Sequence, residues 1–285
     1  MDEKIYKITS IDIGSTNSQI AQTYVAISSE SKAKRHLKVP EKEVQYLLRD
    51  NGKINIPTVL LRKGDLTESQ KMQIEMNKDF LAGFAANELF ERHYGLKLTS
   101  EFKKDFFCSE EAKANEETKE KYEAAEHAIL QFLTFLKQRE SMEEEKYTDA
   151  TEVTVLTHPV KCTDTARDRL KELAANAGWK NVVLRDEARS ALKYALGKKN
   201  SLLVNKLSQL TLLQDLYVLI VDIGGSTTDL ILTKIRPDGN GGFSIDNLKQ
   251  WPPNVGETDP LGSISIDMKF CHWFLENGFL VPELT

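Results

Sequence analysis

The chain has 285 residues, enough to bury a large core in one or two domains. Its hydrophobic content of 40% and charged content of 28% are typical of a soluble globular protein. The net charge of −5 indicates no broad basic surface, so we expect no nucleic-acid partner.

Cysteine usage and hydropathy restrict the compartment. Cys108, Cys162 and Cys271 lie far apart without a Cys-x-x-Cys pair, which argues against a disulfide framework or a zinc site. Reduced thiols of this kind favour a cytoplasmic location. No apolar run approaches the roughly 18 residues of a membrane span, and residues 1–4 lack the character of a signal peptide. We therefore expect no membrane partner.

The chain starts with a hairpin pattern. Two runs rich in Ile, Val, Tyr and Thr, at 5–13 and 19–27, favour strands over helices. The turn between them reads Asp-Ile-Gly-Ser-Thr-Asn at 12–17. Glycine lets backbone N–H groups approach a ligand closely, and successive N–H groups can form an anion-binding nest. This turn is therefore a candidate phosphate loop.

The middle of the chain is largely helical in pattern. An Asp-Asn-Gly-Lys hairpin signal at 50–53 precedes an expected strand over 54–61. Apolar spacing predicts a helix over 80–90 and a long, highly charged helix within 109–146. The predicted buried stripe of the long helix is Ala125, Ile129, Phe132, Leu133 and Leu136.

A strand–helix–strand–helix pattern follows. A strand is expected over 152–157, and Thr163 or Asp164 can cap the next helix. A second strand at 182–184 leads into a helix at 187–196. This order after a hairpin is what a ribonuclease-H-like lobe requires.

A second hairpin comes after a leucine-rich connector. The connector, 198–216, is expected to contain a short amphipathic helix. Strands at 217–223 and 230–235 flank the sequence Asp-Ile-Gly-Gly-Ser-Thr-Thr-Asp at 222–229. A further turn, strand and helix are expected at 239–242, 243–248 and 264–275.

The two hairpins together indicate nucleotide binding. One Asp-x-Gly-x-Thr hairpin is typical of an ordinary tight turn, but two copies about 210 residues apart predict loops that converge on one Mg-triphosphate. The pattern is neither a P-loop nor a dinucleotide fingerprint. Mg²⁺ gives up its water reluctantly, so Asp12 and Asp222 would hold it mostly through water. The predicted binding residues are Asp12, Gly14, Ser15, Thr16 and Asn17 in one hairpin and Asp222, Gly224, Gly225, Ser226 and Thr227 in the other.

At these residues the chain resembles the actin-like ATPase superfamily, which includes actin, sugar kinases and the 70-kDa heat-shock chaperones. Residues 12–18 are especially similar to the chaperone form of the first phosphate loop, and 218–230 looks like its second. Between them, the family's order and spacing are kept by Thr-His-Pro at 157–159, Asp164, Arg167, Ala-Gly at 177–178 and Asp-Glu-Ala-Arg-Ser-Ala-Leu at 186–192. The resemblance covers nearly the whole chain and is densest around 5–20, 151–197 and 217–262.

The resemblance implies an α/β, ribonuclease-H-like architecture of two lobes, with mixed sheets flanked by helices and an incomplete second lobe. The expected parts are a first lobe at 1–197 (core 1–36 and 148–197, inserted subdomain about 37–147), a connector at 198–216 and a partial second lobe at 217–285.

The resemblance also implies an ATP or ADP site with Mg²⁺. Lys103, in a Phe-Lys-Lys context, would lie near the γ-phosphate, and Glu187 would order metal or water. Asp222 and Asp229 would belong to the metal network, with contacts mainly through water. Each role has a structural alternative: a solvated lysine, an acid placed by the helix dipole, or a strand-edge surface acid. The neighbouring Lys104 is not assigned a role at the γ-phosphate.

The chain departs from the family pattern near its end. Gly-Glu-Thr at 256–258 and Leu-Gly at 261–262 resemble the next glycine-rich turn, but 263–267 lacks its second glycine and its acid, so we assign no ligand contacts there. The chain ends at Thr285, before the family's adenosine-binding residues and peptide-binding domain. We expect a fragment of a longer protein rather than a reduced homologue, with weak nucleotide binding and turnover by itself.

The leading functional hypothesis is therefore an ATP-binding and ATP-hydrolysing module similar to the 70-kDa chaperones, coupling nucleotide state to interlobe closure. A client peptide or co-chaperone would bind through regions that this chain lacks. The alternatives are an actin-like filament-forming ATPase, a small-molecule kinase of the same superfamily, or an interaction scaffold without nucleotide.

Overall fold

The computed structural model divides into two compact units, Met1–His158 with Cys162–Glu187, and Pro159–Lys161 with Ala188–Thr285. Each unit has its own sheet. The structure describes residues 4–27, 45–46, 54–93, 95–108, 113–142, 147–160, 162–197, 201–209, 214–238, 243–251 and 262–276. The predicted turns at 50–53, 239–242 and 256–258 lie outside these residues.

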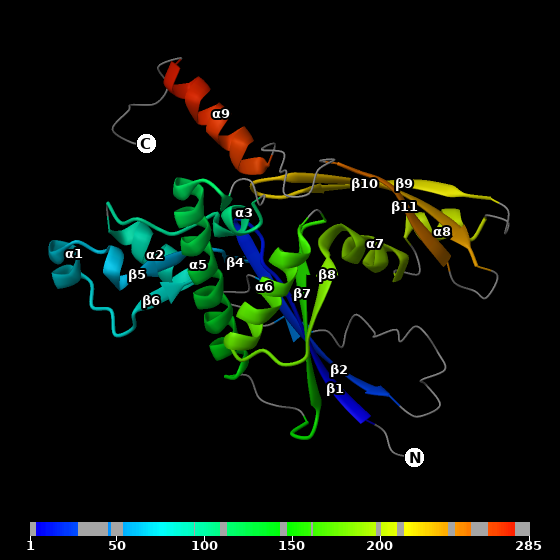
Figure 1. Ribbon diagram of the computed structural model, residues 1–285, viewed down its shortest axis with the longest axis horizontal. Coiled ribbons are helices and arrows are strands. Elements are labelled where there is room, and N and C mark those ends of the chain that lie inside the picture. The colour runs from blue at the N-terminus through cyan, green and yellow to red at the C-terminus, as the bar shows by residue number, and fades with distance from the viewer. Residues whose placement is uncertain are drawn as a thin grey trace. The chain divides into compact units, whose positions relative to one another are not determined.

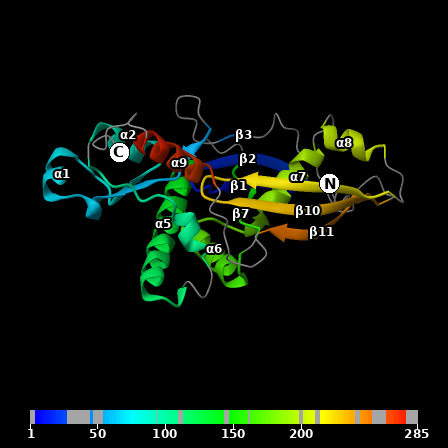
Figure 2. The ribbon, with the colours of Figure 1, turned by 90° about the horizontal axis from the view of Figure 1, so that it is seen from above.

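The sheet of the first unit is mixed. Its strands follow the order β3-β2-β1-β7-β8, with β4 also paired to β2. The β1–β2 hairpin is antiparallel, whereas β7 runs parallel to β1 and β8 parallel to β7. Figure 1 labels β1, β2, β4, β7 and β8, and Figure 2 labels β3. Their bounds are β1 Lys4–Asp12, β2 Asn17–Ile27, β3 Gln45–Tyr46, β4 Ile56–Pro57, β7 Thr151–His158 and β8 Val182–Asp186.

Two long helices cover the core of this unit (Figure 1). The first, α5 (Glu116–Glu140), buries all five residues of the predicted stripe, as its apolar periodicity requires. The second, α6 (Asp164–Asn176), is capped by the hydroxyl of Thr163, which accepts a hydrogen bond from the N–H of Ala166. Among the described helices, none is both long enough and apolar enough to cross a membrane.

The segment between the hairpin and α5 differs from the prediction. The expected strand over 54–61 is two strands, β4 paired to β2, and β5 (Leu60–Arg62) paired to β6 (Phe80–Ala82). The expected helix over 80–90 is wrong at its start, because Phe80–Ala82 is strand and the helix α2 spans Phe84–Arg92. Gly83 between them has φ +62, a conformation that favours glycine and separates the two elements. The other elements here are α1 Glu68–Gln73, the 3-10 turn η3 Lys63–Asp65 and α3 Phe102–Phe106.

The second unit is built on an antiparallel sheet in the order β11-β10-β9 (Figure 2). One face packs on α7 and α8 through Leu192, Leu207 and Ile235, which confirms the short helix expected in the connector. The first residue of α7, Glu187, belongs to the first unit. The bounds are α7 Glu187–Gly197, α8 Leu202–Leu207, β9 Leu216–Ile223, β10 Thr228–Pro237, β11 Phe243–Trp251 and α9 Ser263–Glu276.

Candidate functional site

In the first unit, the candidate residues gather at one edge of the sheet. The strands β1, β7 and β8 are parallel, so their carboxyl ends meet at the same edge, where α/β sheets usually bind ligands. Asp12 ends β1, and the β7–β8 register places His158 opposite Asp186. The hydroxyl of Thr157 donates to Oδ1 of Asp12 over 2.6 Å. The Asp12 carboxylate is therefore oriented by a side chain from a strand 145 residues away.

The first loop, residues 14–17, is a tight turn that requires glycine. A Cβ on Gly14 would lie 2.1 Å from the carbonyl oxygen of Asn17, a clash with backbone. The loop is also held from outside, because the carbonyl of Thr16 accepts a hydrogen bond from the N–H of Thr58 at 2.8 Å. Thr16 and Asn17 are exposed, and Ser15 is half-buried.

Lys103 reaches this region from α3. Phe102 and Phe106 are almost fully buried and fix this five-residue helix in the core. The Nζ atom of Lys103 lies 2.7 Å from Oε1 of Glu187, which directly follows β8. Both side chains are largely enclosed, at 12% and 17% exposure. The adjacent Lys104 is exposed, so the two neighbouring lysines occupy different environments.

The second loop, residues 224–227, repeats the construction of the first. The N–H of Gly224 donates to the carbonyl of Thr227 at 2.8 Å, and a Cβ on Gly224 would lie 3.1 Å from that oxygen. In both hairpins the glycine lies two residues after an aspartate, and a Cβ added to it would lie close to the backbone carbonyl of the residue three positions later. That residue is Asn17 in the first hairpin and Thr227 in the second. The sequence repeat is therefore also a repeat of local backbone geometry.

The start of α9 packs on this second loop, a contact that the sequence did not predict. The N–H groups of Ser263 and Ile264 donate to the carbonyls of Gly224 and Gly225, at 3.0 and 2.9 Å. Because a trans peptide points its C=O and N–H in opposite directions, the N–H groups of Gly225 and Ser226 point away from α9. The only sequence signal was the glycine at 262, which approaches the backbone of Gly225 too closely for a side chain.

Two carboxylates face each other beside the second loop. Asp222 on β9 and Asp229 on β10 are direct cross-strand partners. Like charges at directly opposite positions of a sheet are destabilising. The described residues contain no group of three or more His, Cys, Asp or Glu side chains that could enclose a metal. In proteins Mg²⁺ usually keeps several waters and is bound through one or two carboxylates.

Ser226 has a buried side-chain hydroxyl in this loop. Its residue is 6% exposed, and its Oγ atom is buried without a hydrogen-bond partner among the described residues. Buried hydroxyls are normally paired, so an unpaired one calls for an explanation.

The thiol near the first sheet edge is not a candidate nucleophile. Sγ of Cys162 lies 3.3 Å from Nδ1 of His158, and both residues are buried. Burial raises the pKa of the Cys162 thiol to about 11, although the positive charge of Arg167 opposes this shift. A thiol protonated at neutral pH is a poor nucleophile.

The predicted site residues thus form two sets. Asp12, Lys103, Glu187 and the first loop belong to the first unit, and Asp222, Asp229 and the second loop belong to the second. Each set contains a glycine turn and at least one carboxylate at a strand end.

An antiparallel hairpin that continues into two parallel strands, with helices packed on the sheet, defines an α/β protein of the actin-like fold. The fold class expected from the sequence is confirmed. The chain is similar to the crystal structure of MreB5 of Spiroplasma citri bound to ADP, with a TM-score of 0.53 and 16% sequence identity. The similarity covers 97% of this chain and 58% of that chain, so this chain spans little more than half of its structural neighbour. No protein-family model and no curated protein matches the sequence.

Proposed function

We propose that the chain is a nucleotide-binding module of an actin-like ATPase, which binds ATP or ADP together with Mg²⁺. The observation that carries the proposal is the duplicated hairpin, in which an aspartate at a strand end precedes a glycine closed against a downstream carbonyl. Two such turns suit the two sides of a phosphate chain. The fold similarity to an ADP-bound protein supports the same conclusion.

Each loop has a proposed role in holding the nucleotide. Backbone N–H groups at Gly14, Gly224 and Gly225 would bind phosphate oxygens, because glycine allows close approach. The hydroxyls of Ser15, Thr16, Ser226 and Thr227 would add donors. Asp12, Asp222 and Asp229 would hold the water ligands of Mg²⁺, which would supply positive charge to offset that of the phosphates.

Hydrolysis would depend on Lys103 and Glu187. The transition state of phosphoryl transfer needs positioning and compensating charge more than covalent catalysis. Lys103 would offer its charge to the γ-phosphate, and Glu187 would orient the attacking water. Their ion pair holds both side chains in a fixed place at 2.7 Å. A phosphate entering beside Lys103 would share the lysine with Glu187.

Titration with a fluorescent ATP analogue tests the proposal. We expect the affinity to fall at least about tenfold when Mg²⁺ is removed, or when Asp12→Asn or Asp222→Asn is introduced, because each change removes part of the metal-binding arrangement. A tenfold fall corresponds to about 1.4 kcal/mol of binding free energy. The matched control is Asp149→Asn, an exposed acid outside both loops. Binding that is unaffected by both variants would overturn the proposal. An effect of only one variant would overturn the convergence of the two loops on a single ligand.

The module could belong to a filament-forming ATPase, a chaperone or a small-molecule kinase. An actin-like filament-forming ATPase fits a fold resembling MreB5 at least as well as a chaperone module does. The chaperone reading is supported by the sequence of the first loop, which resembles the chaperone form. ATP-triggered, concentration-dependent light scattering would select the filament, whereas ATPase stimulation by unfolded peptide would select the chaperone. ADP release only after sugar addition would select a kinase.

A further inference from the structure

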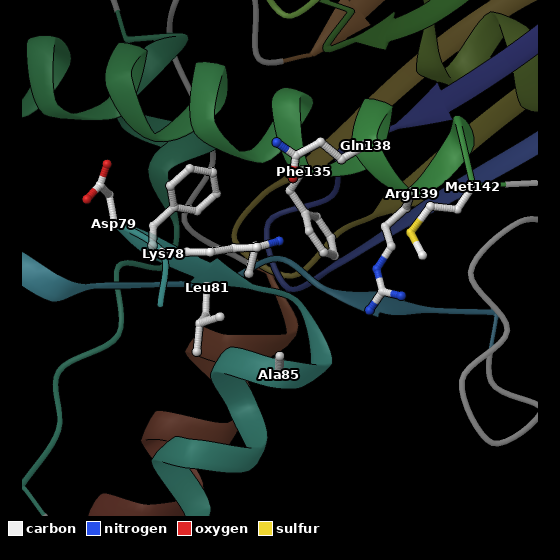
Figure 3. A pocket seen from close by; sticks show the side chains of 10 residues that line it. Lys78, Asp79, Leu81, Ala85, Phe135, Gln138, Arg139 and Met142 are labelled. Carbon is white, nitrogen blue, oxygen red and sulfur yellow. The ribbon is translucent and has the colours of Figure 1, made fainter. Parts of the chain in front are cut away.

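A separate cavity of about 510 Å³ lies in the first unit, between α5 and the β6–α2 segment (Figure 3). This volume is within the usual range of small-molecule sites. No lining residue belongs to the candidate nucleotide site, so a ligand of this cavity would be distinct from the nucleotide. Its lining consists of Lys78, Asp79, Phe80, Leu81, Ala82, Ala85, Phe135, Gln138, Arg139 and Met142.

The walls of the cavity are mainly apolar and come from three elements. Phe80 and Leu81 belong to β6, Ala85 to α2, and Phe135 to α5. Met142, just beyond α5, is 75% exposed, so part of the apolar lining is open to solvent. An apolar body with an aromatic or branched shape would therefore fill the cavity favourably, at roughly 25 cal/mol per Å² of buried apolar area.

Two cations reach the cavity from different elements. In Figure 3, Lys78 extends toward the Phe135 ring and Arg139 points from α5 into the same space. The guanidinium carbon of Arg139 lies 5.9 Å from the Phe135 ring centre. Within the described ranges, neither Lys78 nor Arg139 forms an ion pair. By contrast, Lys137 on the same helix bonds two carboxylates.

A third cation lies next to the cavity. Arg62 is the cross-strand partner of Phe80, so both side chains leave the sheet on the same face. Its Nε atom donates to Gln131, one helical turn before Phe135, but its NH2 nitrogen is buried without an acceptor among the described residues. The positive charge on this side is thus only partly compensated, since Asp79 is the only acidic residue in the lining.

We propose that this cavity binds an amphipathic carboxylate, that is, an aromatic or branched apolar group attached to one carboxylate. The apolar body would contact Phe80 and Phe135, which pack against the same core cluster. The carboxylate would bind Arg139 and Lys78, because charge-assisted hydrogen bonds to carboxylates are the strong ones. A polyphosphate is excluded as the main ligand by the apolar walls and by Asp79. The carboxylate can belong to a small acid or to the C-terminus of a peptide that ends in an aromatic residue.

NMR titration of the full chain tests this proposal with defined probes. The first pair is 3-phenylpropionate and its uncharged amide, and the second is a short peptide ending in Phe with a free or an amidated C-terminus. We expect a dissociation constant on the order of 1 mM for the small acid, given its few heavy atoms, with shifts confined to α5, β6 and α2. The amide should bind about tenfold more weakly, the difference that one lost charge-assisted contact makes. A tighter free peptide would identify a peptide C-terminus as the source, and a tighter small acid would identify a metabolite.

Three variants separate the cavity from general surface binding. Lys78→Met and Arg139→Met keep the apolar stems and should each weaken the acid about three- to tenfold without affecting the amide. Lys97→Met, at an exposed lysine of the same unit, is the control and should change nothing. Ala85→Trp fills the cavity from an exposed position and should abolish binding of all probes while the thermal midpoint is kept. Equal binding of acid and amide, or unchanged binding to the Ala85→Trp variant, would overturn the proposal.

Discussion

Asp222 on β9 and Asp229 on β10 are direct cross-strand partners, and the second loop lies between them in the sequence. Opposed carboxylates weaken an antiparallel pair, and a nearby divalent cation removes the repulsion. The same two residues should therefore lower the stability of the free protein and raise its affinity for a metal-bound ligand.

This relationship predicts effects of opposite sign for Asp229→Asn. The variant should stabilise the nucleotide-free protein by up to about 1 kcal/mol, because a like-charge pair is removed. It should also weaken Mg-dependent nucleotide binding. Urea unfolding without metal and titration with metal measure the two effects. A variant that loses both stability and binding would show that Asp229 has a structural role instead.

The two adjacent lysines on α3 should differ sharply. Replacing the largely enclosed Lys103 by Met leaves Glu187 without this partner and should lower the free energy of unfolding by about 1–3 kcal/mol. Replacing the exposed Lys104 by Met should change it by less than about 0.5 kcal/mol. Urea unfolding compares them, and ATPase activity should be lost only in the first variant. Equal effects would remove the distinction between the two lysines.

The contact between α9 and the second loop should be sensitive to one methyl group. An added Cβ at Gly262 would lie 2.3 Å from the carbonyl oxygen of Gly225, so Gly262→Ala should cost about 1–3 kcal/mol through overpacking. Gly197→Ala, where no atom lies within 4 Å, should be neutral or stabilising by up to about 1 kcal/mol. Urea unfolding of the two variants measures these changes in the free energy of unfolding. Identical behaviour of the two variants would show that α9 does not pack on the loop in solution.

Acid should weaken the contact between α5 and α6. Burial raises the pKa of Glu126, but hydrogen bonds from Arg169 and Tyr122 outweigh it, and the net pKa is lowered. Two guanidinium nitrogens bind this carboxylate, at 2.7 and 3.1 Å. Because the folded-state pKa is the lower one, the stabilisation is present above the ordinary carboxyl pKa of about 4.3 and is lost as pH falls through the folded-state value.

Comparison of Glu126→Gln with Glu123→Gln isolates this pair. Glu126→Gln should reduce stability at pH 7 by about 1 kcal/mol, as for a well-formed, partly exposed ion pair. It should also flatten the fall in stability below about pH 4.5. Glu123 is an exposed acid of the same helix, and its variant should follow the parent protein. The test is the thermal stability of the parent protein and of both variants, measured across pH 3–7. If stability changed with pH in the same way for all three proteins, the prediction would be wrong.

Thiol labelling should distinguish the cysteines. Cys162 is buried and its thiol pKa is about 11, whereas Cys271 is exposed. At pH 7.5 the thiolate fraction of Cys162 should be on the order of 10²-fold below that of an ordinary cysteine with a pKa near 8.5. Alkylation of the native protein, followed by peptide mass spectrometry, should modify Cys271 first. Comparable rates at both residues would show that the environment of Cys162 opens in solution.

The long amphipathic helices were the most predictable part of the fold. In α5, apolar residues recur every three or four positions, so the buried stripe can be read from the sequence. In α6, the capping hydroxyl of Thr163 is a local signal that acts within three residues. The start of α2 was mispredicted because Phe80, Leu81 and Ala82 fit a helix equally well. Pairing with β5 decides for a strand there, and that partner is about twenty residues away.

Both phosphate-loop candidates were visible as sequence motifs, because the glycines and aspartates that form each turn are close neighbours in the chain. The partners that position them were not visible. Thr157 binds Asp12 from a strand 145 residues away, and Lys103 meets Glu187 across 84 residues. No periodicity or spacing rule connects residues so far apart.

The local elements can be read from neighbouring residues alone: two glycine hairpins, the amphipathic stripes and the helix caps. These depend on interactions within a few residues, which steric limits and side-chain periodicity control. The tertiary structure decided the strand order of the sheets, the orientation of Asp12 by Thr157, and the packing of α9 on the second loop. Those features depend on strand register and on the close packing of distant segments, and each becomes fixed only when the whole core forms.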